Sequence, residues 1–255
     1  AANVSSRTGV SWSFRKAEKF FDIVTYTGDG TSSRTIAHSL GSVPAFMTVK
    51  SSSNSSGWRT YHASLGATKY VQLQSTAVAA TYNIWDDTTP TDSVFSISTD
   101  INANGVTYVA YLFASDAGGF GDDEDENIIS CGSYTGNGTT PPVINLGWEP
   151  QWILFKPTTY AEDWTILDVM RGWGAVGADD QVIHPNTSGT ESPDNWMNVT
   201  STGFQPEGSD GHSNQNGVTY IYIAIRRPMK IPEAGTEVFA PVLGVTAGTT
   251  ITGFP

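Results

Sequence analysis

The chain has 255 residues, and 25 Asp and Glu outnumber 13 Lys and Arg, which gives a formal net charge of −12 and an isoelectric point near 4.5. An acidic surface of this kind repels phosphate backbones and anionic lipids, so we expect no nucleic-acid partner. No apolar run is long enough to span a bilayer, and the N-terminus shows no signal-peptide pattern, so we expect neither membrane insertion nor Sec export.

Short apolar runs alternate with segments rich in glycine and proline. The chain has 26 Gly and 13 Pro, while only 15% of its residues are charged, a balance typical of many strands joined by many turns. The single cysteine, Cys131, excludes an intrachain disulfide and a cysteine-based zinc site. Its apolar-alternating surroundings indicate a small core residue, and the composition as a whole predicts an all-β protein.

Residues 1–19 form the first predicted segment. Val10 and Trp12 follow Gly9 in the same way that Val218 and Tyr220 follow Gly217 near the other end of the chain. We therefore predict an N-terminal strand that resembles the last strand of a preceding repeat. Two explanations stay open: the molecule is a fragment of a longer array, or this strand completes a sheet in a neighbouring unit or subunit.

Residues 20–117 form the first predicted repeat. The glycines around Asp29 tolerate positive φ and predict a tight turn between two strands. Pro44 stops strand pairing before the bulky run from Phe46 to Val49, which predicts a strand covered on both faces. Residues 107–113 alternate apolar side chains on both faces, so we predict a central strand there.

Residues 118–127 form the predicted linker, in which glycines precede five consecutive carboxylates, Asp122, Asp123, Glu124, Asp125 and Glu126. A run of like charges is usually a solvated segment. Calcium binding is the alternative because hard cations take clustered oxygen ligands, although the run lacks the alternating spacing and the glycine of an EF-hand loop.

Residues 128–230 form the second predicted repeat, because four blocks of the first repeat recur there in the same order. The matched blocks are Tyr26 to Thr31 with Tyr134 to Thr139, Leu40 to Lys50 with Leu146 to Lys156, Trp58 with Trp164, and Asn104 to Phe113 with Asn216 to Ile225. Four collinear matches indicate a duplication. The predicted fold is two tandem antiparallel β-sandwich repeats, jelly-roll-like, joined end to end by the acidic linker. Residues 231–255 break the pattern and are predicted to be a C-terminal extension or connector.

The sequence shows no catalytic motif of a common class. The four histidines, His38, His62, His184 and His212, are isolated from one another and none recurs at a matched position, so each is expected at a turn or on the surface. Carboxylate pairs such as Asp163 with Asp168 are available for glycoside hydrolysis, but an acidic chain offers many such pairs by chance. We predict no enzyme, no catalytic residue, no metal ligand and no cofactor.

Aromatic side chains give the best functional hint. Those in or beside loop-rich segments are Trp58, Tyr61, Tyr82, Trp85, Trp148, Trp152, Tyr160, Trp164, Trp173 and Trp196. Aromatic faces next to Asp or Asn are suited to stacking sugars and bonding their hydroxyls. Trp58 and Trp164 recur at matched positions, which favours core anchors. Trp85 with Asp86, and Trp173, are unmatched and are predicted as surface contacts.

Several phrases resemble a repeat domain of tail-fibre-like and other virion proteins of marine bacteriophages that infect cyanobacteria and related hosts. The phrases that carry the resemblance are Phe20 to Gly30, Gly105 to Ala114, Ile128 to Gly138, Leu146 to Trp152 and Tyr220 to Arg227. The resemblance covers residues 9 to 230 and implies a structural or host-attachment role on the surface of a virion. It supplies no catalytic residue.

The resemblance also implies partners. We expect other virion proteins, a homo-oligomer with a trimer as the leading choice, and weak multivalent contact with a bacterial surface glycan. A tail fibre or appendage is the leading interpretation. A capsid decoration or vertex protein, a polysaccharide depolymerase and a bacterial adhesin are the alternatives.

Overall fold

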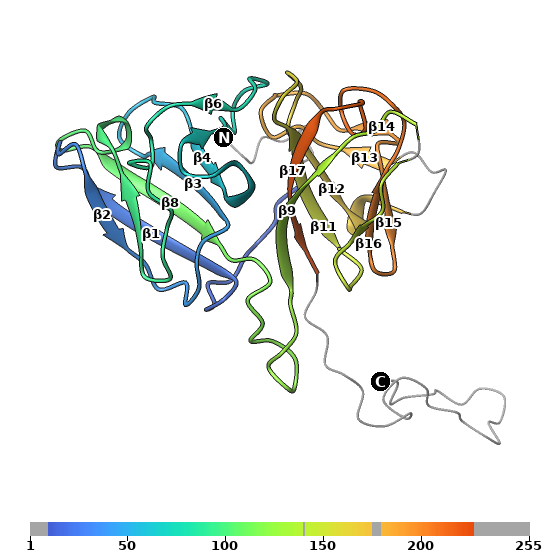
Figure 1. The fold of residues 1–255 in the computed structure, drawn as a ribbon, viewed down its shortest axis with the longest axis horizontal. Helices are drawn as coiled ribbons and strands as arrows, with labels where there is room; N and C mark the ends of the chain where they lie inside the picture. Colours follow the sequence, from blue (N-terminus) through green and yellow to red (C-terminus); the bar gives the residue numbers. More distant parts are fainter. Residues whose placement is uncertain (1–9, 140, 175–179, 227–255) are drawn as a thin grey trace, which may run out of the picture.

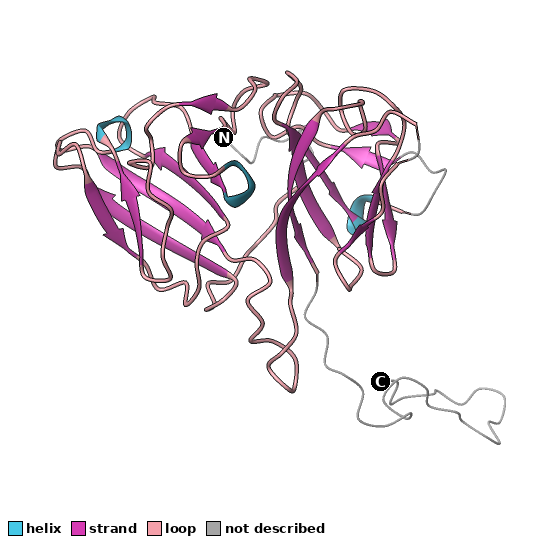
Figure 2. Cartoon of the chain, viewed as in Figure 1, coloured by secondary structure: helices cyan, strands magenta, loops and turns pink. Residues whose placement is uncertain are grey.

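The structure is a computed structural model that describes residues 10–139, 141–174 and 180–226. Strands and loops make up nearly all of these ranges, with three short 3-10 helices (Figure 2), and no helix in them is long and apolar enough to cross a bilayer. In chain order the elements are β1 (Phe21–Thr27), β2 (Arg34–Ala37), β3 (Phe46–Ser51), β4 (Arg59–His62), η1 (Ala63–Leu65), β5 (Lys69–Tyr70), β6 (Ala80–Thr81), β7 (Val94–Ile97), η2 (Thr99–Ile101), β8 (Thr107–Phe113), β9 (Ile129–Thr135), β10 (Ile144–Asn145), β11 (Trp152–Pro157), β12 (Thr165–Asp168), η3 (Val169–Arg171), β13 (Asp180–Val182), β14 (Ser192–Asp194), β15 (Met197–Thr200), β16 (Gly203–Pro206) and β17 (Thr219–Ile225). The predicted all-β, antiparallel sandwich class is confirmed.

Unit 1, residues 20–117, is built on a four-stranded sheet in the order β1-β8-β3-β4. The pair β2-β7 and the pair β5-β6 lie apart from this sheet. Ile36 of β2 and Phe95 of β7 belong to the same buried cluster as Met47 and Leu112 of the large sheet. The core of unit 1 therefore lies between the large sheet and the short strands.

Unit 2, residues 128–226, repeats this plan with the order β9-β17-β11-β12, accompanied by β10-β16-β15 and β13-β14 (Figure 1). Its own core contains Phe155 and Leu167 of the large sheet and Phe204 of β16, all buried. Strand β17 is buried on both faces, as expected for a central strand.

The two units also share their register. Tyr26 of β1 pairs with Tyr108 of β8, and Tyr134 of β9 pairs with Tyr220 of β17. The rings of each pair are stacked, with centroids 5.1 Å apart in unit 1 and 4.9 Å apart in unit 2. The matched sequence blocks therefore occupy equivalent places in the two sheets.

The predicted strand, turn and second strand around Asp29 are present as β1, residues 28–33 and β2, but the two strands do not pair with each other. Strand β1 belongs to the large sheet, whereas β2 pairs with β7, so the chain passes from one layer to the other. A Cβ on Gly28 would lie 2.1 Å from the carbonyl oxygen of Ala103, and Gly30 has a φ of +78°. Close approach and a positive φ explain the two glycines.

The units pack side by side, not end to end as predicted. Leu154, Trp164 and Ile223, on the face of the unit 2 sheet that points away from its own core, lie in one buried cluster with Phe46 and Phe113 of unit 1. Backbone and side-chain hydrogen bonds cross the same boundary, for example from Trp164 Nε1 to the Gln72 carbonyl at 2.9 Å. Apolar burial on this outer face of the unit 2 sheet holds the units together.

Residues 10–16 form no strand, so the predicted N-terminal strand is wrong for this stretch. Phe14 packs between Phe113 of unit 1 and Trp152 of unit 2, with centroid distances of 5.7 Å to each ring. Trp12 Nε1 donates to Asp168 Oδ2 at 3.1 Å. The segment thus fills space between the units instead of pairing with a sheet. Residues 1–9 and the predicted extension 231–255 lie outside the described residues.

The acidic linker is a small hairpin rather than a featureless connector. Gly119 N donates to the Glu124 carbonyl at 2.8 Å, and Glu126 N donates to the Phe120 carbonyl at 2.9 Å. The hairpin projects from the molecule between β8 and β9 (Figure 1). Residues 122–125 are exposed, as predicted for a solvated segment, whereas Glu126 pairs with Arg226.

Candidate functional site

The structure places both tryptophans predicted as surface contacts in the interior. Trp85 is 0% exposed and packs edge-on against Tyr61, and Trp173 is 3% exposed and donates from Nε1 to the Met197 carbonyl at 2.7 Å. The surface-contact hypothesis is therefore wrong for both indoles, because each fills the core of its unit. Asp86 stays near the surface, where it accepts a hydrogen bond from Ser33 Oγ at 3.0 Å.

The two recurring tryptophans differ in burial. Trp164 is 1% exposed and anchors the contact between the units, where its ring lies 6.5 Å from that of Phe46. Trp58 is half-buried and its ring lies 6.1 Å from that of Tyr111. The predicted anchor role is confirmed for Trp164, while Trp58 lies on a partly open sheet face.

Cys131 is half-buried against the shared apolar cluster, and burial raises the pKa of its thiol well above the ordinary value. His62 is 0% exposed, so its predicted surface position is wrong: Nε2 lies 3.0 Å from the Tyr222 carbonyl across the unit boundary. Within the described ranges no group of three or more His, Cys, Asp or Glu side chains is arranged to hold a metal ion, and this includes Asp122 to Glu126.

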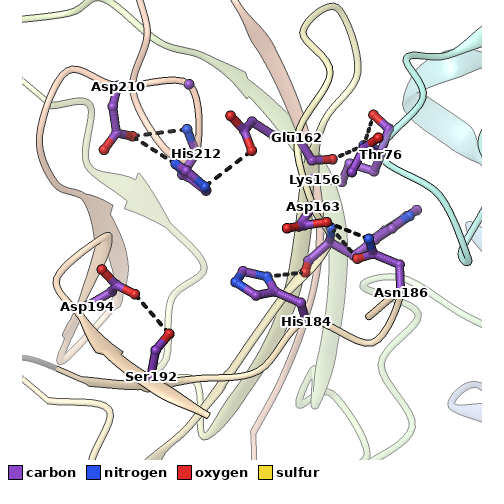
Figure 3. A network of polar contacts seen from close by, with 12 residues as sticks. Thr76, Lys156, Glu162, Asp163, His184, Asn186, Ser192, Asp194, Asp210 and His212 are labelled. Carbon is purple, nitrogen blue, oxygen red and sulfur yellow. Dashed lines mark hydrogen bonds and ion pairs between the residues drawn. The ribbon is translucent and has the colours of Figure 1, made fainter. Parts of the chain in front are cut away.

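A cluster on unit 2 joins histidines that are far apart in the sequence. Trp196, just before β15, stacks on His212 with centroids 4.0 Å apart and an interplanar angle of 14°. His184, just after β13, lies 5.6 Å from the same indole. Figure 3 shows His184 and His212 with the carboxylates of Asp163, Glu162, Asp194 and Asp210 around them. The two histidines lie outside the strands and are half-buried, and their separation in the sequence gave no indication that they contact the same indole.

Hydrogen bonds and ion pairs fix the cluster. His212 Nε2 lies 3.2 Å from Glu162 Oε2, and its backbone N–H donates to Asp210 Oδ1 at 3.0 Å. Asn186 Nδ2 donates to Asp163 Oδ1 at 2.5 Å, and His184 Nδ1 lies 2.9 Å from the Trp164 carbonyl. Each ring and carboxylate is thus held in one orientation before any ligand arrives, which reduces the entropy lost on binding.

A buried lysine ties the cluster to unit 1. Lys156 is 0% exposed, and its Nζ donates to the Glu162 carbonyl at 2.6 Å and to the Thr76 carbonyl at 3.1 Å (Figure 3). Burial lowers the pKa of its amine to about 8, against the opposing effect of the carboxylates of Asp163 and Glu162. The lysine therefore positions the loop that carries Glu162, and its burial removes it from contact with a ligand.

Tyr160 gives the cluster an accessible aromatic ring. It is 41% exposed, and a Cβ on Gly211 would lie 2.4 Å from its Cε1 atom, so the ring edge rests on the backbone beside His212. Together, Tyr160, Trp196, His212, Glu162 and Asp210 offer apolar ring surface bordered by hydrogen-bond acceptors and an imidazole. Such a surface can stack a sugar ring and accept hydrogen bonds from its hydroxyls. We name these five residues the aromatic cluster.

Only one sequence signal could have found the aromatic cluster. When the two repeats are aligned without gaps, Ser56 of unit 1 corresponds to Glu162 and Asn54 corresponds to Tyr160. Asn102 and Asn214 accept equivalent backbone hydrogen bonds, and aligning them makes Asp100 correspond to His212. The positions at which the two repeats carry different residues were therefore the ones that could have indicated the aromatic cluster. Their convergence in space depends on loops whose paths the sequence pattern does not predict.

Comparisons with curated proteins and with solved structures each returned no match. A family model described as a domain of unknown function matches residues 2–227 and so covers both units. The chain therefore belongs to the DUF7483 family.

Proposed function

We propose that this chain is a structural protein of a bacteriophage virion, in a tail fibre or another appendage, and that unit 2 contacts a bacterial surface glycan. The observation that carries the glycan contact is the aromatic cluster, which only one of two otherwise equivalent units possesses. Residues that both units share serve the common fold, so a preorganised polar and aromatic group found in one unit is the better candidate for a specialised role.

The chemistry of the cluster favours a neutral or amino sugar. The Tyr160 ring supplies a face for C–H groups, while Glu162 and Asp210 accept hydrogen bonds from hydroxyl or ammonium groups. An acidic polysaccharide would face these carboxylates and a chain of net charge −12. A single shallow site of this kind binds weakly, and several copies on one particle would raise the avidity.

The virion assignment rests on the sequence resemblance to phage repeat domains. A duplicated sandwich with matched cores suits a mechanical role, because repeated units extend a structure without requiring a new fold. Other virion proteins and further copies of this chain, with a trimer as the leading choice, are the partners that the assignment implies.

The glycan contact is tested by binding of the full chain to surface polysaccharide purified from a cyanobacterial host. We expect Tyr160→Ala to weaken binding about tenfold, because it removes the exposed ring. Tyr82→Ala is the matched control, since Tyr82 is an exposed tyrosine of unit 1, at 57%. Equal loss in both variants, or no binding by the unaltered chain, would contradict the proposal. Release of new reducing ends would instead favour a depolymerase.

The virion assignment has its own test. Antibodies raised against the chain should label purified phage particles at a tail fibre or appendage in electron micrographs. Labelling confined to the capsid would favour the decoration or vertex interpretation. Absence of the chain from purified particles would remove the assignment.

A further inference from the structure

The two units carry equivalent corners, each built from the first residue of one strand, the last residue of the next, and the 3-10 helix that follows. The first corner comprises Phe46 and residues 62–65, and the second comprises Trp152 and residues 168–171. A side chain at the N-cap closes each corner: His62 Nδ1 accepts from Ser64 N at 3.1 Å, and Asp168 Oδ1 accepts from Arg171 N at 3.1 Å. The corners thus share the same order of elements and an N-cap residue with extended backbone.

The first corner is covered within the chain. Its helix η1 packs against β9, and the Phe46 ring lies 6.5 Å from that of Trp164. His62 Nε2 lies 3.0 Å from the Tyr222 carbonyl. The partner of the first corner is therefore the outer sheet face of unit 2, meaning the face of its four-stranded sheet that points away from its own core.

Among residues 10–139, 141–174 and 180–226, only Trp12 and its neighbours cover the second corner, which is otherwise open. A groove of about 280 Å³ lies beside it, and Trp12, Trp152, Met170, Arg171 and Arg226 are among the residues that line it. Met170, the counterpart of Ser64, is 91% exposed. The buried Nε1 of Trp152 and Nε of Arg226 have no hydrogen-bond partner within the described ranges. An exposed methionine beside unpaired buried donors is an unfavourable surface for a monomer.

The outer sheet face of unit 1 is also partly open, beyond the end at which Phe46 and Phe113 meet unit 2. It is the counterpart of the unit 2 face that covers the first corner, and matching the sheets puts Ile23 in the place of Cys131 and Tyr111 in the place of Ile223. Ile223 is 1% exposed, whereas Tyr111 is half-buried and Ile23 is 43% exposed. The half-buried Trp58 lies beside Tyr111 on the same face. One corner and part of one sheet face are thus left uncovered by the described residues, although each has a buried counterpart elsewhere in the chain.

We propose that the second corner docks on the outer sheet face of unit 1 in a second copy of this chain, repeating between molecules the contact made within each molecule. Within the chain η1 packs against β9. The counterparts of these two elements are η3 and β1, so the proposed contact brings Met170 of one copy against β1 of the other, next to Ile23. The contact is heterologous, so successive copies form a closed ring or a filament. This inference goes beyond the proposed function and is independent of the glycan site.

Trp12 occupies part of the second corner. Its Nε1 donates to Asp168 at 3.1 Å, and the guanidinium of Arg171 lies 5.4 Å from its ring centroid. At the first corner His62 is the counterpart of Asp168, and its ring meets the Tyr222 carbonyl of unit 2 where Asp168 meets Trp12. Trp12 therefore holds the place of the incoming sheet, and docking displaces it.

Cysteine pairing between copies tests the direction of the contact. Full chains carrying Met170→Cys or Ile23→Cys, both with Cys131→Ser, are mixed and oxidised. We expect the mixed disulfide between the two variants to form faster than either homodimer. Val143→Cys, at a residue that is 60% exposed on unit 2, replaces Met170→Cys in the control. Mixed pairing no faster than this control, or a dominant Met170→Cys homodimer, would overturn the proposal.

Sedimentation velocity provides the second measurement, and the unaltered chain should associate as its concentration rises. Met170→Asp and Ile23→Asp should each weaken association at least about tenfold, because each places a charge in an apolar contact, whereas Val143→Asp should not. Trp12→Ala should strengthen association by freeing the corner. The docking would be contradicted if the unaltered chain and the Trp12→Ala variant both stayed monomeric at all concentrations, or if the Met170→Asp variant associated as well as the unaltered chain.

Discussion

Unit 1 and unit 2 have the same strand order in their four-stranded sheets, the same stacked tyrosine pair and a corner closed by an N-cap side chain, yet they differ in the burial of equivalent residues. The unit 2 sheet is buried on both faces, whereas the outer face of the unit 1 sheet is partly open. The difference teaches that duplication preserved the backbone plan and the core, while burial at equivalent positions came to depend on what each unit packs against.

The largest difference in stability between the two units should appear when the recurring tryptophans are replaced by alanine. Trp164→Ala should destabilise the chain by about 3–5 kcal/mol because it empties a buried site between the units, whereas Trp58→Ala should cost about 1 kcal/mol because its ring is half-exposed. Urea unfolding followed by far-UV circular dichroism measures both. Equal losses would mean that the units do not share the cluster around Trp164.

Acidification should destabilise the first corner because His62 is buried there in its neutral form. Burial lowers the pKa of His62 to about 4 from an ordinary value of 6.5, so the unfolded chain binds more protons between these values. The contribution of His62 is therefore complete above pH 6.5 and is lost as the pH falls towards 4, by up to about 3 kcal/mol. Urea unfolding at several pH values between 7.5 and 4.5 measures this loss.

His62→Gln is the control for this acid effect, because the pKa of His38 is also lowered by burial and His38 remains in both chains. The substituted chain should lose less stability over the same pH range. A parallel decline in the two chains would show that His62 is protonated in the folded state.

Removal of the tyrosine hydroxyl should lower the stability by the same amount in the two units. Tyr26 donates its hydroxyl to the Ile101 carbonyl at 2.8 Å, and Tyr134 donates to the Ser213 carbonyl at 2.8 Å. Tyr26→Phe and Tyr134→Phe should each cost about 1–2 kcal/mol, because each leaves a buried carbonyl without its partner. Thermal unfolding of both variants checks the equivalence, which a difference larger than about 1 kcal/mol would contradict.

Substitutions in the acidic hairpin should have the smallest effect on stability. Neutralising residues 122–125 by Asp→Asn and Glu→Gln changes should alter stability by less than about 0.5 kcal/mol, because these side chains are exposed. Glu126→Gln should cost more, since Glu126 pairs with Arg226. Millimolar calcium should not raise the melting temperature. A calcium-dependent rise that disappears on neutralisation would establish a cation site there.

Sequence reasoning was most successful where a residue's role is local. The glycines after Tyr26 and the central strand at residues 107–113 follow from patterns that short-range sterics impose. It failed for Trp85 and Trp173, because an unmatched tryptophan beside aspartate or glycine looks the same in sequence whether it faces solvent or a core. It also missed His62, whose burial comes from the other unit.

The sequence by itself determined the all-β class and the duplication, since alternation, turn residues and internal matches are properties of neighbouring positions. The tertiary structure alone decided that the units lie side by side, that residues 10–16 fill the space between them, and that His184, Trp196 and His212 meet. Those outcomes depend on which apolar faces bury one another at long range. Many pairings satisfy the same local pattern, and only the packing of the whole chain selects among them.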